Sequence, residues 1–203
     1  MKYIVKSPEP EVFASWKAAR LGATYNEGLG RAPGVKRALK TSLLQEQKFL
    51  CCYCECRIDA DHSHIEHFRP KGMPEFSALQ LDYGNLHASC TRQPTGSSEE
   101  HCGHKKGDSF SDDLVSPLES DCATHFKFTF DGSIEGLDEK GRTTIDILHL
   151  DSALLNSQRK KLIEYFLDLD DELVALEVSS HLDETKPKSG EFYSMIKALY
   201  GDM

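Results

Sequence analysis

The segment from Cys51 to Asp108 constrains the fold most, because it is rich in Cys, His and Gly and poor in aliphatic residues. Six of the seven cysteines and six of the nine histidines of the chain lie in it. Such a segment has too few apolar side chains for an ordinary hydrophobic core and needs another source of stability. Metal ligation by thiolates is the leading interpretation, since an odd number of cysteines cannot all pair as disulfides.

The first residues of the chain indicate the cellular compartment in which these thiols are expected to lie. Residues 1–10, MKYIVKSPEP, contain no apolar stretch typical of a signal peptide. No apolar run in the chain approaches the ~20 residues that a membrane span needs. We therefore expect a cytoplasmic protein without a membrane partner, in which the thiols stay reduced.

Four cysteines have a spacing that suits a closed tetrahedral zinc site, with Zn–S bonds of about 2.3 Å. They are a C-x-x-C pair and two later residues: Cys51, Cys54, Cys90 and Cys102. Residues 91–101, between the last two, are expected to form a solvated loop. Cys52 and Cys56 also have a tolerable spacing, and His101 or His104 could replace a thiolate. The alternative is a set of ordinary buried cysteines, and Cys122 is expected to be a packed thiol.

Length and charge limit the architecture and the partners. The 203 residues suit one domain, or one domain with a small lobe. The net charge is −9, with +2 in residues 1–108 and −11 in residues 109–203. Because affinity for nucleic acid depends on neutralising phosphates, the chain alone should bind a polyanion weakly. A basic partner is expected to help.

Hydrophobic periodicity predicts the elements around the cysteine-rich segment. Helices are expected over residues 11–19, 35–49 and 191–200, and one long helix or two over residues 152–178 with Ser152 as N-cap. Residues 125–136 are expected to form a hairpin that turns tightly at Asp131-Gly132. Its alternating aromatic residues, Phe126, Phe128 and Phe130, are expected to lie in the core.

These elements predict an α+β fold that is mostly helical, with a metal-stapled core, flanking helices and a small hairpin. Three regions are expected. An N-terminal helical arm spans residues 1–50, the metal-bearing core spans residues 51–108, and an acidic helical lobe with the hairpin spans residues 109–203. The lobe is a candidate partner interface.

Four ordered blocks resemble the motif of an HNH nuclease. They are C-x-Y-C-E at Cys51 to Glu55, I-E-H-F-R-P-K at Ile65 to Lys71, Y-G-N-L-H-A-S-C at Tyr83 to Cys90 and C-G-H-K-K-G-D at Cys102 to Asp108. The similarity is to the PtuB-type subgroup, the HNH component of Septu-like antiphage defence, which also occurs beside some retron reverse transcriptases. Similar flanking segments extend it over most of the chain.

The resemblance implies a zinc-stapled ββα-metal core that hydrolyses phosphodiester bonds. By position, Glu66 would ligate a catalytic Mg²⁺ or Mn²⁺, and His67 would be the general base. Asn85 would fix the loop and orient the base, and His104 would be a helix-borne metal ligand. This division suits the chemistry, because hard divalent ions prefer oxygen ligands and a neutral imidazole can take a proton from water.

The third position of the motif departs from the common family pattern. That pattern places the residue directly after the last cysteine, where this chain has Gly103. His104 is displaced by one position, and Asp108 is a competitor for the role.

Strand geometry sets a condition on Glu66 and His67. Adjacent strand residues point to opposite faces, so the two can serve one phosphate only at a distorted strand end, for which Arg69-Pro70 is the expected cause. In a regular strand His64 would share a face with Glu66. Otherwise His62 and His64 are most simply interpreted as part of a solvated turn.

Basic residues near the motif could contact phosphates, although a solvated basic surface is an equal alternative. They are Arg69, Lys71, Lys105 and Lys106. The resemblance favours DNA as the substrate and implies a PtuA-like ATPase partner, with a retron reverse transcriptase and its msDNA as a further candidate. An RNase that cleaves tRNA, a noncatalytic zinc adaptor and, least favoured, a thiol redox protein are the alternatives.

Overall fold

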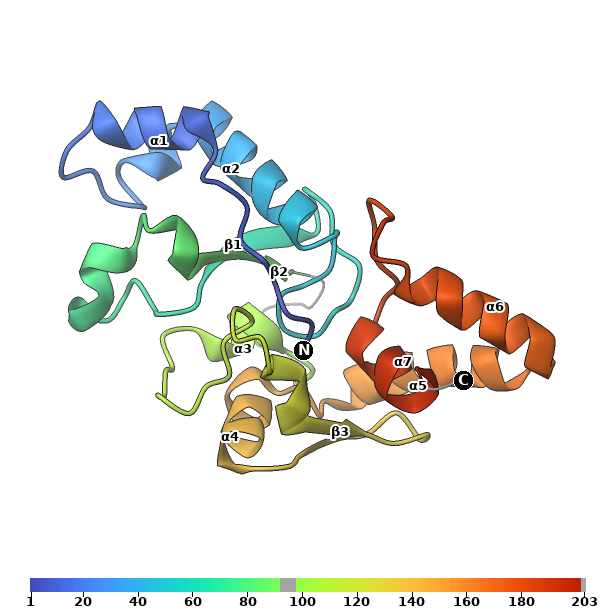
Figure 1. Ribbon diagram of the computed structural model, residues 1–203. Coiled ribbons are helices and arrows are strands. Elements are labelled where there is room, and N and C mark those ends of the chain that lie inside the picture. Colours follow the sequence, from blue (N-terminus) through green and yellow to red (C-terminus); the bar gives the residue numbers. More distant parts are fainter. Residues whose placement is uncertain (92–97, 202–203) are drawn as a thin grey trace.

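The computed structural model describes residues 1–91 and 98–201; most of the predicted 91–101 loop thus lies outside the described residues. The chain runs from an N-terminal helical arm, through a central strand pair, to a C-terminal helical lobe (Figure 1). The α-helices and strands are α1 (Glu11–Ala18), α2 (Pro33–Glu46), β1 (Ser63–His67), β2 (Leu86–Cys90), α3 (Cys102–Lys106), β3 (Phe126–Phe128), β4 (Ile134–Gly136), α4 (Glu139–Leu148), α5 (Ala153–Leu167), α6 (Asp171–Leu182) and α7 (Tyr193–Tyr200).

The arm consists of α1 and α2, which pack together through buried apolar side chains such as Phe13 and Leu39. The predicted helix over 35–49 ends early, at Glu46. Lys48 and Phe49 adopt left-handed backbone conformations, with φ of 53° and 60°. The Gln47 side chain stabilises this turn, because its Nε2 donates to the Leu50 carbonyl at 2.8 Å.

The centre is the antiparallel pair β1–β2, followed in the chain by the short helix α3. The register places Glu66 opposite His87 and His64 opposite Ser89. α3 contacts β2 and α4. This arrangement brings the cysteines at the end of β2 and the start of α3 close to the earlier C-x-x-C pair.

The predicted hairpin is present as β3 and β4, which pair antiparallel with Phe126 opposite Gly136. Its connection is longer than the expected tight turn and covers residues 129–133, with Gly132 at φ 88°. Phe126 and Phe128 are buried, as predicted. Phe130 is 54% exposed, which corrects its assignment to the core, because β3 ends before it.

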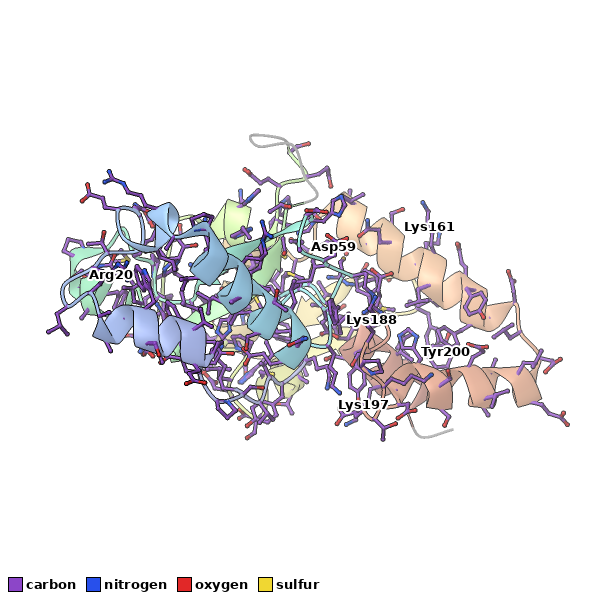
Figure 2. The ribbon with its side chains drawn as sticks, turned by 90° about the horizontal axis from the view of Figure 1, so that it is seen from above. Arg20, Asp59, Lys161, Lys188, Lys197 and Tyr200 are labelled. Atoms are coloured by element: carbon purple, nitrogen blue, oxygen red, sulfur yellow. The ribbon has the colours of Figure 1, made fainter. Side chains whose placement is uncertain are left out.

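The predicted helical stretch over residues 152–178 is two helices, α5 and α6. Ser152 caps α5 by accepting a hydrogen bond from the Leu155 N–H at 3.3 Å, and Asp170 caps α6. Viewed from above, α5 to α7 form the end of the molecule opposite to α1, as the labelled Tyr200 and Arg20 show (Figure 2).

In the part of the chain that the structure describes, the fold class is α+β, with two small antiparallel sheets and more residues in helices than in strands. Among residues 1–91 and 98–201, no helix is both long enough and apolar enough to cross a membrane. The region boundaries at residues 50 and 108 stay a prediction.

Candidate active site and metal centre

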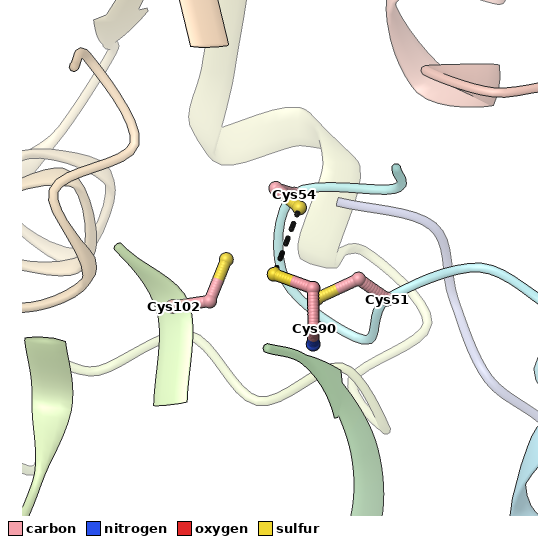
Figure 3. Close-up of side chains that lie close together, drawn as sticks. All are labelled: Cys51, Cys54, Cys90 and Cys102. Carbon is pink, nitrogen blue, oxygen red and sulfur yellow. Dashed lines mark hydrogen bonds between the residues drawn. The ribbon is translucent and has the colours of Figure 1, made fainter. Parts of the chain in front are cut away.

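Four cysteine sulfurs form a compact, buried cluster between the β2–α3 region and the C-x-x-C turn (Figure 3). The Sγ atoms of Cys51, Cys54, Cys90 and Cys102 all lie within 4.8 Å of one another. Cys54 and Cys90 are separated by 3.8 Å, Sγ to Sγ. A tetrahedral ion with Zn–S bonds of about 2.3 Å requires sulfur separations of about 3.8 Å. The donor set and its spacing therefore fit a metal ion.

The C-x-x-C turn is shaped by its own backbone. The Cys51 N–H donates to the Cys56 carbonyl at 2.9 Å, and Glu55 takes a left-handed φ of 63°. The Glu55 carboxylate accepts from the Ser194 N–H at 2.7 Å and lies 2.9 Å from the Met1 amino group. These contacts stabilise a conformation that a non-glycine residue seldom adopts.

The remaining cysteines have other surroundings. Cys52 and Cys56 are buried outside the group of four, and Cys56 Sγ lies 3.5 Å from Gln158 Oε1. Cys122 is a packed thiol, as predicted, and burial raises its pKa to about 11. His101 Nδ1 lies 3.1 Å from Cys102 Sγ, at the edge of the cluster.

Thiols packed this closely perturb one another. Despite burial, the pKa of Cys51 lies well below its usual value, because neighbouring cysteines, Cys102 first, stabilise its thiolate through hydrogen bonds. Burial, together with the bond to Cys51, raises the pKa of Cys102 well above its usual value. Only a cation at the centre would allow all four sulfurs to be thiolates together.

Glu66 is a buried carboxylate with two differently engaged oxygens. Oε1 lies 2.9 Å from Lys106 Nζ, and Oε2 lies 3.1 Å from His64 Nε2. Burial opposes ionisation, but the bond to His64 and the Lys106 charge outweigh it, so the pKa of Glu66 lies below its usual value. The carboxylate is therefore ionised at neutral pH.

His67, the last residue of β1, has different contacts from those of Glu66. Its Nε2 lies 3.1 Å from the Gln80 carbonyl, and its ring meets Tyr25 edge-on at a centroid distance of 4.5 Å. Because a carbonyl can only accept, Nε2 carries the proton and Nδ1 has the lone pair. Burial lowers the pKa of His67 to about 4, so the imidazole is neutral at physiological pH.

Asn85 joins β2 to the long connection that follows β1. Its Oδ1 accepts from the Arg69 N–H at 2.8 Å, and its Nδ2 donates to the carbonyls of Arg69 and Leu79 at 3.0 and 3.2 Å. Leu79 directly precedes Gln80, whose carbonyl contacts His67. Asn85 thus fixes the backbone against which the His67 ring is held.

A cavity of about 220 Å³ lies at the end of β1 and is lined by both Glu66 and His67. The other lining residues are His64, Ile65, Pro70, Lys71, Gly103, Gly107 and Asp108. Asp108, the competitor for the third motif position, is among them, whereas His104 is not. The His104 ring instead stacks on that of His64, with centroids 4.8 Å apart.

The four basic residues predicted to contact phosphates divide into two groups. Arg69, Lys71 and Lys105 are exposed, and Lys71 lines the cavity. Lys106 is 1% exposed, which corrects its assignment to a phosphate-contacting surface. Its ammonium lies between Glu66 and the His67 carbonyl, to which it donates at 2.9 Å, because α3 packs against the strand pair.

Two residues of this site differ from the roles that the sequence predicts for them. The sequence predicts a solvated turn for His64 and a phosphate-binding surface for Lys106, but both side chains contact Glu66. The signal for His64 was the two-residue strand period, which requires residues 64 and 66 to share a face. We find no local signal that would have indicated the burial of Lys106.

Sequence similarity to known proteins shows the class of protein to which this site belongs. The chain belongs to the PtuB-like family of HNH endonucleases, as predicted, and is therefore a nuclease, a phosphodiester hydrolase.

The similarity to individual relatives differs in extent. The chain is 32% identical over 175 residues to a protein named as the HNH endonuclease of retron Vc95 from Vibrio cholerae serotype O1 biovar El Tor, covering 82% of each. It is 35% identical over 125 residues to Septu protein PtuB from Bacillus thuringiensis, covering 60% of this chain and 44% of PtuB. An Escherichia coli protein named for retron Ec83 shares 32% identity over 96 residues, covering 44% of this chain and 37% of the relative. No family model matches the chain.

Proposed function

We propose that this protein is the cation-dependent endonuclease of a cytoplasmic antiphage defence complex, and that β1, β2 and α3 form a ββα-metal core. DNA is the favoured substrate. The observation that carries the proposal is one cavity lined by an ionised, buried Glu66 and a neutral His67. A fixed negative ligand and a base at one cavity are the groups that hydrolysis of a phosphodiester requires.

His67 supplies the base. Its Nδ1 lone pair takes the proton of a water molecule that attacks phosphorus, while the Gln80 carbonyl retains the proton on Nε2. As the new P–O bond forms, the bond to the leaving sugar oxygen breaks. Asn85 and Lys106 hold the backbone on both sides of His67, through Arg69 and the His67 carbonyl respectively. The base is thereby oriented before substrate binds.

Glu66 is the proposed ligand of the catalytic divalent cation, Mg²⁺ or Mn²⁺. When bound, this cation would polarise the scissile phosphate and stabilise the leaving oxygen. The exposed side chains of Arg69, Lys71 and Lys105 are the proposed phosphate contacts. The separate four-cysteine cluster is the proposed site of a structural Zn²⁺, whose binding would contribute folding free energy to this segment.

An ATPase of the PtuA type is the proposed partner, and a retron reverse transcriptase with its msDNA is a further proposed partner. Relatives named for Septu and for retrons support this choice. The charge distribution gives an independent reason, because residues 109–203 carry a net −11 that opposes unaided capture of nucleic acid.

The test is a cleavage assay with purified protein, alone and with the partner ATPase, on plasmid DNA and on tRNA. We expect Mg²⁺- or Mn²⁺-dependent cleavage of plasmid DNA that His67→Ala abolishes. His62→Ala is the matched control, because His62 is exposed and bonded to Asp59 outside the cavity. Faster cleavage of tRNA would reassign the substrate. Metal-bound protein without any nuclease activity in the complex would contradict the proposal.

A further inference from the structure

His64 and Glu66 present two metal-binding atoms side by side. They lie two residues apart on β1, so both side chains are on the same face of the strand pair. His64 Nε2 and Glu66 Oε2 are 3.1 Å apart, and both residues line the cavity at the end of β1. His64 is thus part of the site and not of a solvated turn.

The separation of these two atoms fits a shared cation. In octahedral geometry with bonds of about 2.1 Å, neighbouring ligand atoms are about 3.0 Å apart. The observed hydrogen bond can be replaced by a cation if the imidazole proton moves from Nε2 to Nδ1. Within the described part of the chain, Nδ1 has no hydrogen-bond partner, so this move breaks no bond at that atom.

Lys106 leaves only one Glu66 oxygen for a cation. The Lys106 side chain is fully buried. Its ammonium lies 2.9 Å from Glu66 Oε1 and also donates to the His67 carbonyl. Tyr53 adds a longer hydrogen bond to the same oxygen, at 3.4 Å. Oε2, the oxygen beside His64, is therefore the Glu66 atom that would ligate a cation.

Gly103, at the start of α3, keeps the space next to both atoms open. A Cβ at this position would overlap Glu66 Oε2 and would lie 2.6 Å from His64 Nε2. The His104 side chain, one residue later, stacks on the face of the His64 ring. The lone pair of an imidazole nitrogen lies in the plane of the ring, so two stacked rings do not direct their lone pairs at the same ion. The stack with His104 therefore supports the orientation of the His64 ring.

We propose that His64 Nε2 and Glu66 Oε2 are the protein ligands of the catalytic divalent cation, with His104 as the ring that supports His64. The proposal rests on the nuclease function proposed above and assigns the imidazole ligand of that site. Because a nitrogen ligand suits Mn²⁺ better than the oxygen-preferring Mg²⁺, the site should also favour Mn²⁺.

The test uses Mn²⁺ as the probe and needs no catalysis. Electron spin-echo measurements on the Mn²⁺-loaded full chain should show ¹⁴N coupling from an imidazole ligand. We expect His64→Ala to remove this coupling and to weaken Mn²⁺ binding at least about tenfold. His104→Ala should retain the coupling, and His62→Ala, with an exposed imidazole on the same segment, should leave both measurements unchanged.

A second variant keeps the proposal testable if His64→Ala loses its zinc or unfolds. Gly103→Ala would place a methyl group against both ligand atoms and should weaken Mn²⁺ binding with His64 intact. Gly34→Ala is the matched control, because a Cβ at residue 34 meets no atom within 4 Å.

The outcomes separate the two proposals. Coupling that persists in His64→Ala and disappears in His104→Ala would overturn the assignment of His64 while leaving the nuclease function standing. Unchanged Mn²⁺ binding in Gly103→Ala would also overturn it. A wild-type chain that binds no Mn²⁺, even with the partner and DNA, would overturn both.

Discussion

Asn85→Ala should destabilise the connection between β1 and β2 by a measurable amount. The side chain is 6% exposed and makes three hydrogen bonds, of 2.8, 3.0 and 3.2 Å, to the backbone of Arg69 and Leu79. At about 1 kcal/mol for each bond, the free energy of unfolding should fall by about 3 kcal/mol. For a chain of this length that corresponds to a decrease in Tm of about 6–12 °C.

The assay combines urea unfolding with hydrogen exchange of the backbone amides. In Asn85→Ala the Arg69 amide, which donates to Asn85 Oδ1, should exchange faster than in the wild type. Nuclease activity should fall as well, because the Gln80 carbonyl beside His67 is no longer held in place. Asn26→Ala is the control, since Asn26 is exposed and should change stability by less than about 0.5 kcal/mol. A stability loss below about 0.5 kcal/mol for Asn85→Ala, with unchanged exchange at Arg69, would refute the reasoning.

Three further predictions test other parts of the molecule. Cys54→Ser should reduce bound zinc and lower Tm, because a structural metal contributes folding free energy; an unchanged zinc content by elemental analysis would contradict this. Gly132→Ala should destabilise the protein by more than about 1 kcal/mol, because φ is 88° and a Cβ would lie 2.7 Å from the Lys160 nitrogen, whereas Gly34→Ala in a thermal melt should be neutral or slightly stabilising. Burial lowers the pKa of His181 in the folded protein, despite the hydrogen bond to the Glu191 carbonyl. As the pH drops below about 6.5, the unfolded chain is protonated at His181 before the folded protein is, so the free energy of unfolding should fall. Urea unfolding at pH 5 and 7.5 should show a smaller pH dependence of this free energy in His181→Gln than in the wild type.

The local patterns in the sequence predicted much of the secondary structure. The helix over residues 11–19, the Ser152 cap and the final helix are present, because capping residues and helical periodicity act within a few positions of one another. The early end of α2 was missed. It depends on Gln47, which also bonds to Ala88 in β2, 41 residues away in the chain.

Apolar spacing was a weaker guide to the core than to the helices. In α6 the periodic Leu173 and Leu176 are 46% and 65% exposed, while Val174 and Val178 are buried. A helix with apolar residues on several faces can bury any of them, and the packing of α5 and α7 selects which. The exposure of Phe130 has a different origin, because β3 ends before that residue.

Residue chemistry and spacing indicated the four-cysteine framework, and the resemblance of four sequence blocks to HNH nucleases pointed to Glu66, His67 and the family. Thiols and carboxylates at fixed intervals are properties of the chain itself. Only the tertiary structure decided that Lys106 is buried against Glu66 and that the His104 ring lies on His64. Those contacts depend on how α3 docks on the strand pair, and docking is set by long-range packing that no local pattern encodes.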